Sequence, residues 1–170
     1  MGKKSVRENK NIYFESREEQ GLTRAQASEL LGTISESRLE KMETGKTSIY
    51  PEDVVEMARA YKKPGLCNYY CTHECRIGQT SVPEVKASTL SEIVLGMLSS
   101  LNALERQRDR LIDITADGEI SDDELQDFAD IQRQLENIDM TVESLKLWVA
   151  KTISEGKINE EKLNRLMSKS

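Results

Sequence analysis

The chain has 170 residues and a formal net charge of −6, and its residues are 37% hydrophobic, 32% charged and only 5% aromatic. This length suits a small domain plus a second helical unit, and the shortage of aromatic and β-branched residues favours helices over a thick β-sandwich core. No run of about eighteen apolar residues is present, which excludes a transmembrane helix, and the basic N-terminal MGKKSVRENK lacks the apolar stretch of a secretion signal. We therefore expect a cytoplasmic protein without a membrane partner, whose three cysteines are reduced unless they bind metal.

The negative charge is concentrated in the second part of the chain. Residues 1–66 contain 12 of the 24 Lys and Arg and 11 of the 30 Asp and Glu, which leaves 12 basic and 19 acidic residues for 67–170. A DNA-binding domain needs basic charge on one face rather than a basic total. The nearly neutral first part is therefore compatible with nucleic-acid binding.

Four short helical patterns follow one another in the first part. The first covers residues 9–19, and a second begins at Thr23, where Thr-Arg-Ala-Gln has the spacing of a capping box, and ends at Gly32. A third begins at Ser35 and a fourth at Pro51, where a missing amide proton costs nothing. Apolar residues at helical spacing predict the inward side chains of the last three helices: Leu30, Leu31, Leu39, Met42, Val54, Val55, Met57, Ala58 and Tyr61.

Short helices joined by a glycine-containing turn are typical of a helix-turn-helix, and the strings GLTRAQASELLG, SRLEKMETGK and YPEDVVEMARAY make the likeness specific. With them, about a third of the chain resembles the Xre/Cro-repressor family. The matching positions are Arg17, Leu22, Thr23, Gly32, Ser35, Glu43, Gly45, Lys46, Pro51 and Ala58. The chain departs from the family pattern in one extra residue between Gly32 and Glu43, and in Ser28 where alanine is usual. The resemblance implies a lambda-repressor-like domain that binds double-stranded DNA.

In this family the third helix lies in the major groove. The resemblance therefore implies a set of DNA-binding candidates, comprising base readers on the third helix and phosphate contacts beside it: Arg24, Ser35, Glu36, Ser37, Arg38, Lys41, Lys46 and Thr47. Arg38 has the chemistry to bind guanine through two hydrogen bonds. The carboxylates of Glu36 and Glu40 are repelled by phosphates, so each either accepts from a cytosine amino group or remains in solvent.

All three cysteines and the single histidine lie within the segment LCNYYCTHECRIG. Its cysteines are spaced i, i+4 and i+8, which is one stripe on a helix, whereas structural zinc sites combine two separated ligand pairs. An iron–sulfur cluster would need a fourth ligand from elsewhere. The segment resembles one in a Firmicutes-type group of Xre regulators. Ordinary thiols remain an alternative to a zinc or iron–sulfur site, whose candidate ligands are Cys67, Cys71, His73 and Cys75.

After a linker around Pro83, apolar residues repeat in steps of three and four over residues 90–111 and again over 128–149. Heptad spacing of this kind predicts two long helices that pack as a coiled-coil-like antiparallel hairpin, and its small core favours pairing with a second copy. The segment between them matches a calcium loop at several positions, with Asp113, Thr115, Asp117, Glu119 and Glu124 as candidate ligands. The alternative is a helix stop at Gly118 followed by a capping box from Ser121 to Glu124.

The sequence thus predicts an all-α protein with a helix-turn-helix domain at 1–66, a cysteine-rich connector at 67–88 and a dimerising hairpin at 89–170. The expected function is sequence-specific regulation of transcription, with a homodimer repressing from a palindromic operator. The alternatives are a protein-interaction or antitoxin-like module with little DNA affinity, which Glu36 and Glu40 favour, and a metal- or redox-sensing regulator. One histidine and no carboxylates clustered in an apolar setting provide no catalytic set, so we do not expect an enzyme.

Overall fold

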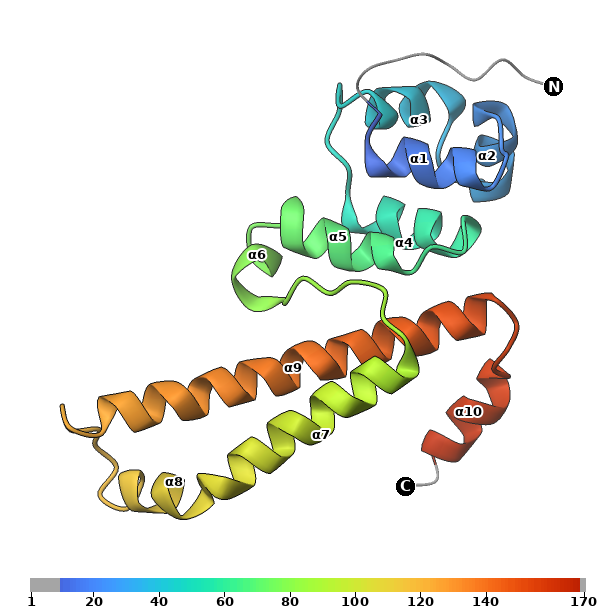
Figure 1. Ribbon diagram of the computed structural model, residues 1–170. Coiled ribbons are helices and arrows are strands. Elements are labelled where there is room, and N and C mark those ends of the chain that lie inside the picture. Colours follow the sequence, from blue (N-terminus) through green and yellow to red (C-terminus); the bar gives the residue numbers. More distant parts are fainter. Residues whose placement is uncertain (1–9, 169–170) are drawn as a thin grey trace. The chain divides into compact units, whose positions relative to one another are not determined.

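A computed structural model describes residues 10–168. Within this range the secondary structure consists of α-helices without strands, as the sequence predicted (Figure 1). The helices are α1 Ile12–Glu19, α2 Arg24–Leu31, α3 Glu36–Glu43, α4 Pro51–Ala60, α5 Gly65–His73, α6 Gly78–Ser81, α7 Leu90–Arg106, α8 Arg108–Ile114, α9 Leu125–Ser154 and α10 Glu160–Met167. None of these helices is long and apolar enough to cross a membrane. The basic segment before Lys10 lies outside the described residues.

The described residues form two compact units. One comprises the residues up to Val82 together with those from Ala150 onward, and the other comprises Pro83–Val149. The predicted division at residues 66 and 88 is not tested by this grouping and stays a prediction.

Side-chain caps begin α2 and α3 where the sequence predicted them. Thr23 accepts from the backbone N–H of Gln26, and the Gln26 side chain accepts in return from the backbone N–H of Thr23, so the capping box is confirmed. Ser35 caps α3 by accepting from the N–H of Arg38. Pro51 is the first residue of α4. Each cap provides a partner for a backbone group that has none inside the helix.

The core of this unit is formed by α1 to α5. Its buried side chains are Tyr13, Ala27, Leu31, Ile34, Leu39, Met42, Val54, Met57, Ala58, Tyr61 and Leu66. Two predicted core residues are wrong, because Leu30 is 56% exposed and Val55 is 45% exposed. Leu30 precedes the buried Leu31, and Val55 follows the buried Val54. Consecutive side chains on a helix point about 100° apart. Only one of each pair can therefore face the core.

The second unit contains α7, α8 and the greater part of α9, with α7 and α9 running in opposite directions in Figure 1. An added Cβ on Gly96 would lie 3.3 Å from the Thr141 methyl group, so α7 approaches α9 closely there. The first predicted long helix is interrupted at Gln107, which separates α7 from α8. Between α8 and α9, Gly118 has a φ of 78°, and Glu124 accepts from the backbone N–H and hydroxyl of Ser121. Helix α8 ends at Ile114, before Gly118, and α9 begins at Leu125, so the calcium loop and its alternative of a helix stop and a capping box both stay predictions.

Candidate nucleic-acid interface

The turn between α2 and α3 is fixed by both backbone and side-chain contacts. Gly32 ends α2 with a φ of 68°, a region that glycine enters without steric cost. Ser28 then donates its hydroxyl to the carbonyl of Ile34 over 2.8 Å, and the Ile34 side chain is buried in the core. Ser28 thus connects the end of α2 to the turn, and α3 leaves the turn in a defined direction.

Helix α3 has one buried side and one exposed side. Leu39, Met42 and Glu43 face the core. Among the predicted base readers, Glu36, Ser37 and Lys41 are exposed and Arg38 is partly exposed. The hydroxyl oxygen of Ser35 accepts from the helix, so this residue contributes as a cap. The exposed side therefore presents polar groups of both charges to a ligand.

The buried side of α3 carries an ion-pair network. Glu43 is 2% exposed, and its carboxylate accepts from Arg17 Nε at 2.5 Å and Nη2 at 3.0 Å. Arg17 Nη1 also donates to the carbonyl of Leu22 at 2.5 Å. Burial opposes the charged form of Arg17, but the hydrogen bond and charge of Glu43 outweigh it and raise the arginine pKa. This network connects α1, the turn before α2, and α3.

Arg24, predicted to contact phosphate, joins the same network. Its Nε donates to Glu43 at 2.8 Å, and its guanidinium lies 6.0 Å from the centre of the Phe14 ring. About a quarter of the Arg24 side chain, 26%, stays exposed. Burial, followed by the charge of Glu43, raises the pKa of Tyr61 to about 12, and the hydroxyl of this tyrosine has no hydrogen-bond partner among the described residues.

Arg38 is held by two residues that the sequence did not single out. Its Nη2 donates to Asp53 Oδ2 at 2.5 Å, and its guanidinium lies 5.2 Å from the centre of the Tyr50 ring. The same Asp53 oxygen accepts from the backbone N–H of Tyr50 at 3.1 Å at the start of α4. Asp53 is the third residue of α4, a position at which a carboxylate is a sequence signal for capping. Its contact with Arg38 on α3, in contrast, depends on tertiary packing. We call Arg38, Tyr50 and Asp53 the Arg38 clamp.

The remaining DNA-binding candidates lie beyond α3. Lys46 is exposed, and its backbone N–H donates to the carbonyl of Lys41 at 2.8 Å, so the end of α3 fixes its position. Thr47 is half-buried. The eight candidates therefore lie on α2, at the cap of α3, on α3 or in the segment after it. Their roles at DNA remain predictions.

The cysteine-rich segment forms α5 and the turn after it. Cys67, Cys71 and Cys75 are free and half-buried, and burial followed by the charge of Cys71 raises the pKa of Cys67. The ring of His73 stacks on the ring of Tyr69, with the ring centres 4.3 Å apart. Within the described residues no group of three His, Cys, Asp or Glu side chains is arranged to hold a metal ion.

The predicted calcium ligands lie on α8, in the connecting segment and just before α9. Asp117 accepts from the backbone N–H of Glu119 at 3.1 Å, and Thr115 donates its hydroxyl to the carbonyl of Leu111 at 2.9 Å. Glu124 is occupied by its contacts with Ser121. These three side chains contact groups within the same segment, and calcium binding there stays a prediction.

Comparison with known proteins agrees with this geometry. The sequence model of a helix-turn-helix domain family matches residues 15–65, from α1 to the start of α5. No significant match was found to a curated protein or a solved structure. The match supports DNA binding and transcription regulation as the general role of this segment.

Proposed function

Because residues 15–65 form a helix-turn-helix domain, we propose that this protein is a sequence-specific transcriptional regulator that binds double-stranded DNA. In this proposal it acts as a homodimer on a palindromic operator and represses by occluding it. The observation that carries the proposal is the exposed polar side of α3, which is held rigidly by a fastened turn and a buried ion-pair network.

The size of α3 supports docking in the major groove. An α-helix with its side chains is about 10–12 Å in diameter, and the major groove of B-DNA is about 12 Å wide, so α3 can enter it. The N-terminal half of the helix carries Ser37 and Arg38, and the first turn of a recognition helix is the part that contacts base edges in this motif. Arg38 keeps donors beyond the one used by Asp53, because a guanidinium has five N–H groups.

The charge of this surface predicts weak binding by one domain. Lys41 and Lys46 are opposed by Glu36 and Glu40, so few phosphates are neutralised per domain. Two copies on two half-sites multiply the effective affinity without new contacts. A homodimer on a palindrome is therefore the arrangement that gives this domain useful affinity.

Selection of bound sequences from a pool of random DNA by the full-length chain tests the proposal. We expect enrichment of a motif with two-fold symmetry. Lys46→Ala should weaken binding to all sequences and reduce the salt dependence by about one counterion. Arg133→Ala on α9 is the matched control, since it removes a cation outside the matched domain. No enrichment above input at low salt would reject the proposal.

A protein-interaction or antitoxin-like role is the second candidate. Glu36 and Glu40 are both exposed on α3, and a carboxylate pair is more easily accommodated by a basic protein surface than by DNA. Under this alternative the DNA selection yields no motif, while the chain co-purifies with a basic partner through α3. A sensor role for the cysteines adds to either function, and metal analysis of protein purified without oxygen tests it.

A further inference from the structure

Tyr50 is the one aromatic side chain of residues 10–168 that is exposed rather than buried or half-buried. Its relative exposure is 55%, and it immediately precedes α4. Aromatic rings stabilise cores and interfaces when other groups cover them. An aromatic ring that stays open to solvent beside a recognition helix is therefore a candidate contact for the ligand of that helix.

The Arg38 clamp holds this ring beside a base-reading candidate. The guanidinium of Arg38 lies 5.2 Å from the centre of the Tyr50 ring, and the Arg38 side chain is 33% exposed. Asp53 accepts from Arg38 Nη2 and from the backbone N–H of Tyr50, so one carboxylate fixes the arginine and the tyrosine relative to each other. The bond to Asp53 takes one of the five N–H groups of the guanidinium, and the others remain for a ligand. A ligand that binds these N–H groups comes next to the Tyr50 ring.

The chemistry of the major groove indicates what the ring contacts. Each base pair presents hydrogen-bonding groups there, whereas the only apolar group is the C5 methyl of thymine. Arginine binds guanine through the O6 and N7 acceptors. Successive base pairs lie about 3.4 Å apart, so a ring centred 5.2 Å from a guanine-bound Arg38 reaches the neighbouring base pair. A thymine methyl in that base pair is an apolar partner for the ring.

We propose that Arg38 and Tyr50 together read a step of two base pairs, in which Arg38 binds a guanine and the Tyr50 ring packs on the methyl group of a thymine in the adjacent base pair. The proposal rests on the proposed function, and it names the base step that each half-site contains. Asp53 is the positioning residue of this pair.

A phosphate is the other group that Tyr50 could contact at DNA. The face of an aromatic ring carries partial negative charge, so only the hydroxyl of Tyr50 suits a phosphate oxygen. A methyl group, in contrast, packs on the ring and does not need the hydroxyl. Substitutions that separate the ring from the hydroxyl therefore distinguish the two contacts.

Replacement of thymine by uracil removes the C5 methyl group and leaves the hydrogen-bonding groups of the base unchanged. The probe is a duplex carrying the motif that the full-length chain selects from random DNA. Selection with Arg38→Ala identifies the guanine, as the position at which the base preference is lost. Uracil in place of the adjacent thymine should weaken binding about three- to fivefold for each half-site, which is the contribution of one buried methyl group. Fluorescence anisotropy measures the affinities.

Two substitutions of Tyr50 assign this effect to the ring. Tyr50→Phe keeps the ring and should retain the uracil effect, whereas Tyr50→Ala should bind the thymine and uracil duplexes equally. The backbone N–H that donates to Asp53 is present in both variants, so the contact at the start of α4 is preserved. Far-ultraviolet circular dichroism verifies that each variant is folded.

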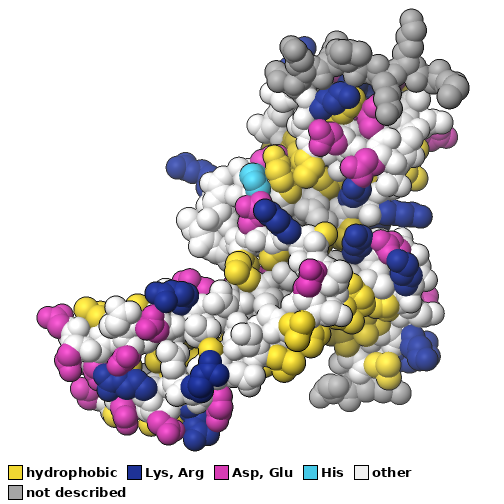
Figure 2. Space-filling model, viewed as in Figure 1, with side chains coloured by type: hydrophobic (Ala, Val, Ile, Leu, Met, Phe, Trp, Pro, Cys, Tyr) yellow, Lys and Arg dark blue, Asp and Glu magenta, His cyan; other side chains and the backbone are white. Residues whose placement is uncertain are grey.

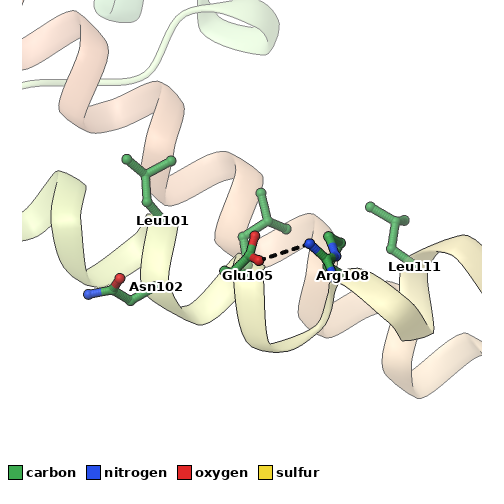
Figure 3. A pocket seen from close by; sticks show the side chains of 6 residues that line it. Leu101, Asn102, Glu105, Arg108 and Leu111 are labelled. Atoms are coloured by element: carbon green, nitrogen blue, oxygen red, sulfur yellow. Dashed lines mark hydrogen bonds and ion pairs between the residues drawn. The ribbon is translucent and has the colours of Figure 1, made fainter.

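Arg108 provides the matched control for Arg38. It lies on α8 at the end of the second unit where Figure 2 shows many carboxylates, and it is outside the matched domain. Like Arg38, it pairs with a carboxylate, that of Glu105 at 3.2 Å, on the wall of a surface groove (Figure 3). Arg108→Ala should leave both the selected motif and the uracil effect unchanged.

Several results would overturn the proposal while the selected motif, and with it the proposed function, still stands. They are an Arg38→Ala variant that loses no guanine preference, a guanine without thymine in either adjacent base pair, a wild type indifferent to uracil, and an undiminished uracil effect in Tyr50→Ala. If Tyr50→Phe weakens every duplex as much as Tyr50→Ala and uracil has no effect, the hydroxyl contacts the DNA backbone instead. A selection that yields no motif rejects the proposed function, and the base step is rejected with it.

Discussion

Glu43 is the side chain on which the orientation of α3 depends. It is buried at the base of that helix and compensates the charge of Arg17, whose side chain is only 4% exposed, as well as part of the charge of Arg24. A buried ion pair contributes little net stability compared with a well-packed apolar pair, but removing one member leaves an uncompensated charge. The network therefore fixes one arrangement of α1, α2 and α3 more than it adds to the free energy of unfolding.

We expect Glu43→Gln to destabilise the protein by about 3–5 kcal/mol, since it leaves the Arg17 guanidinium buried without a counter-charge. Urea denaturation followed by circular dichroism measures this loss. Glu56→Gln provides the comparison, because the Glu56–Arg59 pair is exposed and such pairs contribute less than about 1 kcal/mol. Equal stability of the two variants would show that the buried network is dispensable.

The Arg38 clamp leads to a prediction about base discrimination. Arg38→Ala should reduce affinity for the selected operator by about 1–3 kcal/mol. Asp53→Asn keeps an oxygen that can accept from Tyr50, but it weakens the hold on Arg38 and removes a negative charge near the phosphates. We therefore expect Asp53→Asn to increase affinity for random DNA while lowering the ratio of operator to random binding. Fluorescence anisotropy with both DNAs measures this ratio, and an unchanged ratio would mean that the clamp does not position Arg38 for reading.

At the scale of whole helices, local signals predicted most of the first unit. The Thr23 and Ser35 caps, the Gly32 stop and Pro51 each act within a few residues, so the sequence displays them directly. The end of α7 at Gln107 has no proline or glycine to mark it, and the pairing of Arg38 with Asp53 joins residues 15 positions apart. Such features arise from packing between helices, which residue spacing in one helix does not reveal.

Helix α6 depends on a close backbone approach. An added Cβ on Gly78 would lie 2.2 Å from the carbonyl oxygen of Cys71, and a backbone atom cannot move aside cheaply. We expect Gly78→Ala to destabilise the first unit by about 1–3 kcal/mol, and thermal unfolding measures the change. Ser81→Ala in the same helix serves as the control, because Ser81 is exposed. Equal melting temperatures for the two variants would contradict the contact.

The whole molecule divides its charge between its units. In Figure 2, charged side chains with many carboxylates cover the end of the second unit where α8 and the start of α9 lie. This acidic surface is repelled by DNA, which leaves the helix-turn-helix domain as the part that can approach it. The composition of the sequence predicted this division of charge. Which face of α7 is exposed depends on its packing against α9, so the sequence alone did not predict it.

A dimer that reads two half-sites should distinguish a complete operator from half of one. We expect scrambling of one half-site to weaken binding about 10²–10⁴-fold, because the second domain no longer binds at high effective concentration. Electrophoretic mobility shifts with matched duplex lengths provide the measurement. Equal affinity for both duplexes would indicate that one domain binds alone.

The contacts of α5 have a practical consequence for anyone preparing a minimal fragment of this protein. Leu66 is 2% exposed in the same core as α1 to α4, and Tyr13 on α1 donates its hydroxyl to Glu74 at 3.0 Å just after α5. Ending the chain at residue 66 would remove the rest of α5, which packs against that core, and the Glu74 acceptor of Tyr13, whereas ending it after Val82 retains them and the α6 turn. A fusion partner or purification tag is therefore best joined after residue 82, so that the cysteine-bearing segment travels with the domain it packs against.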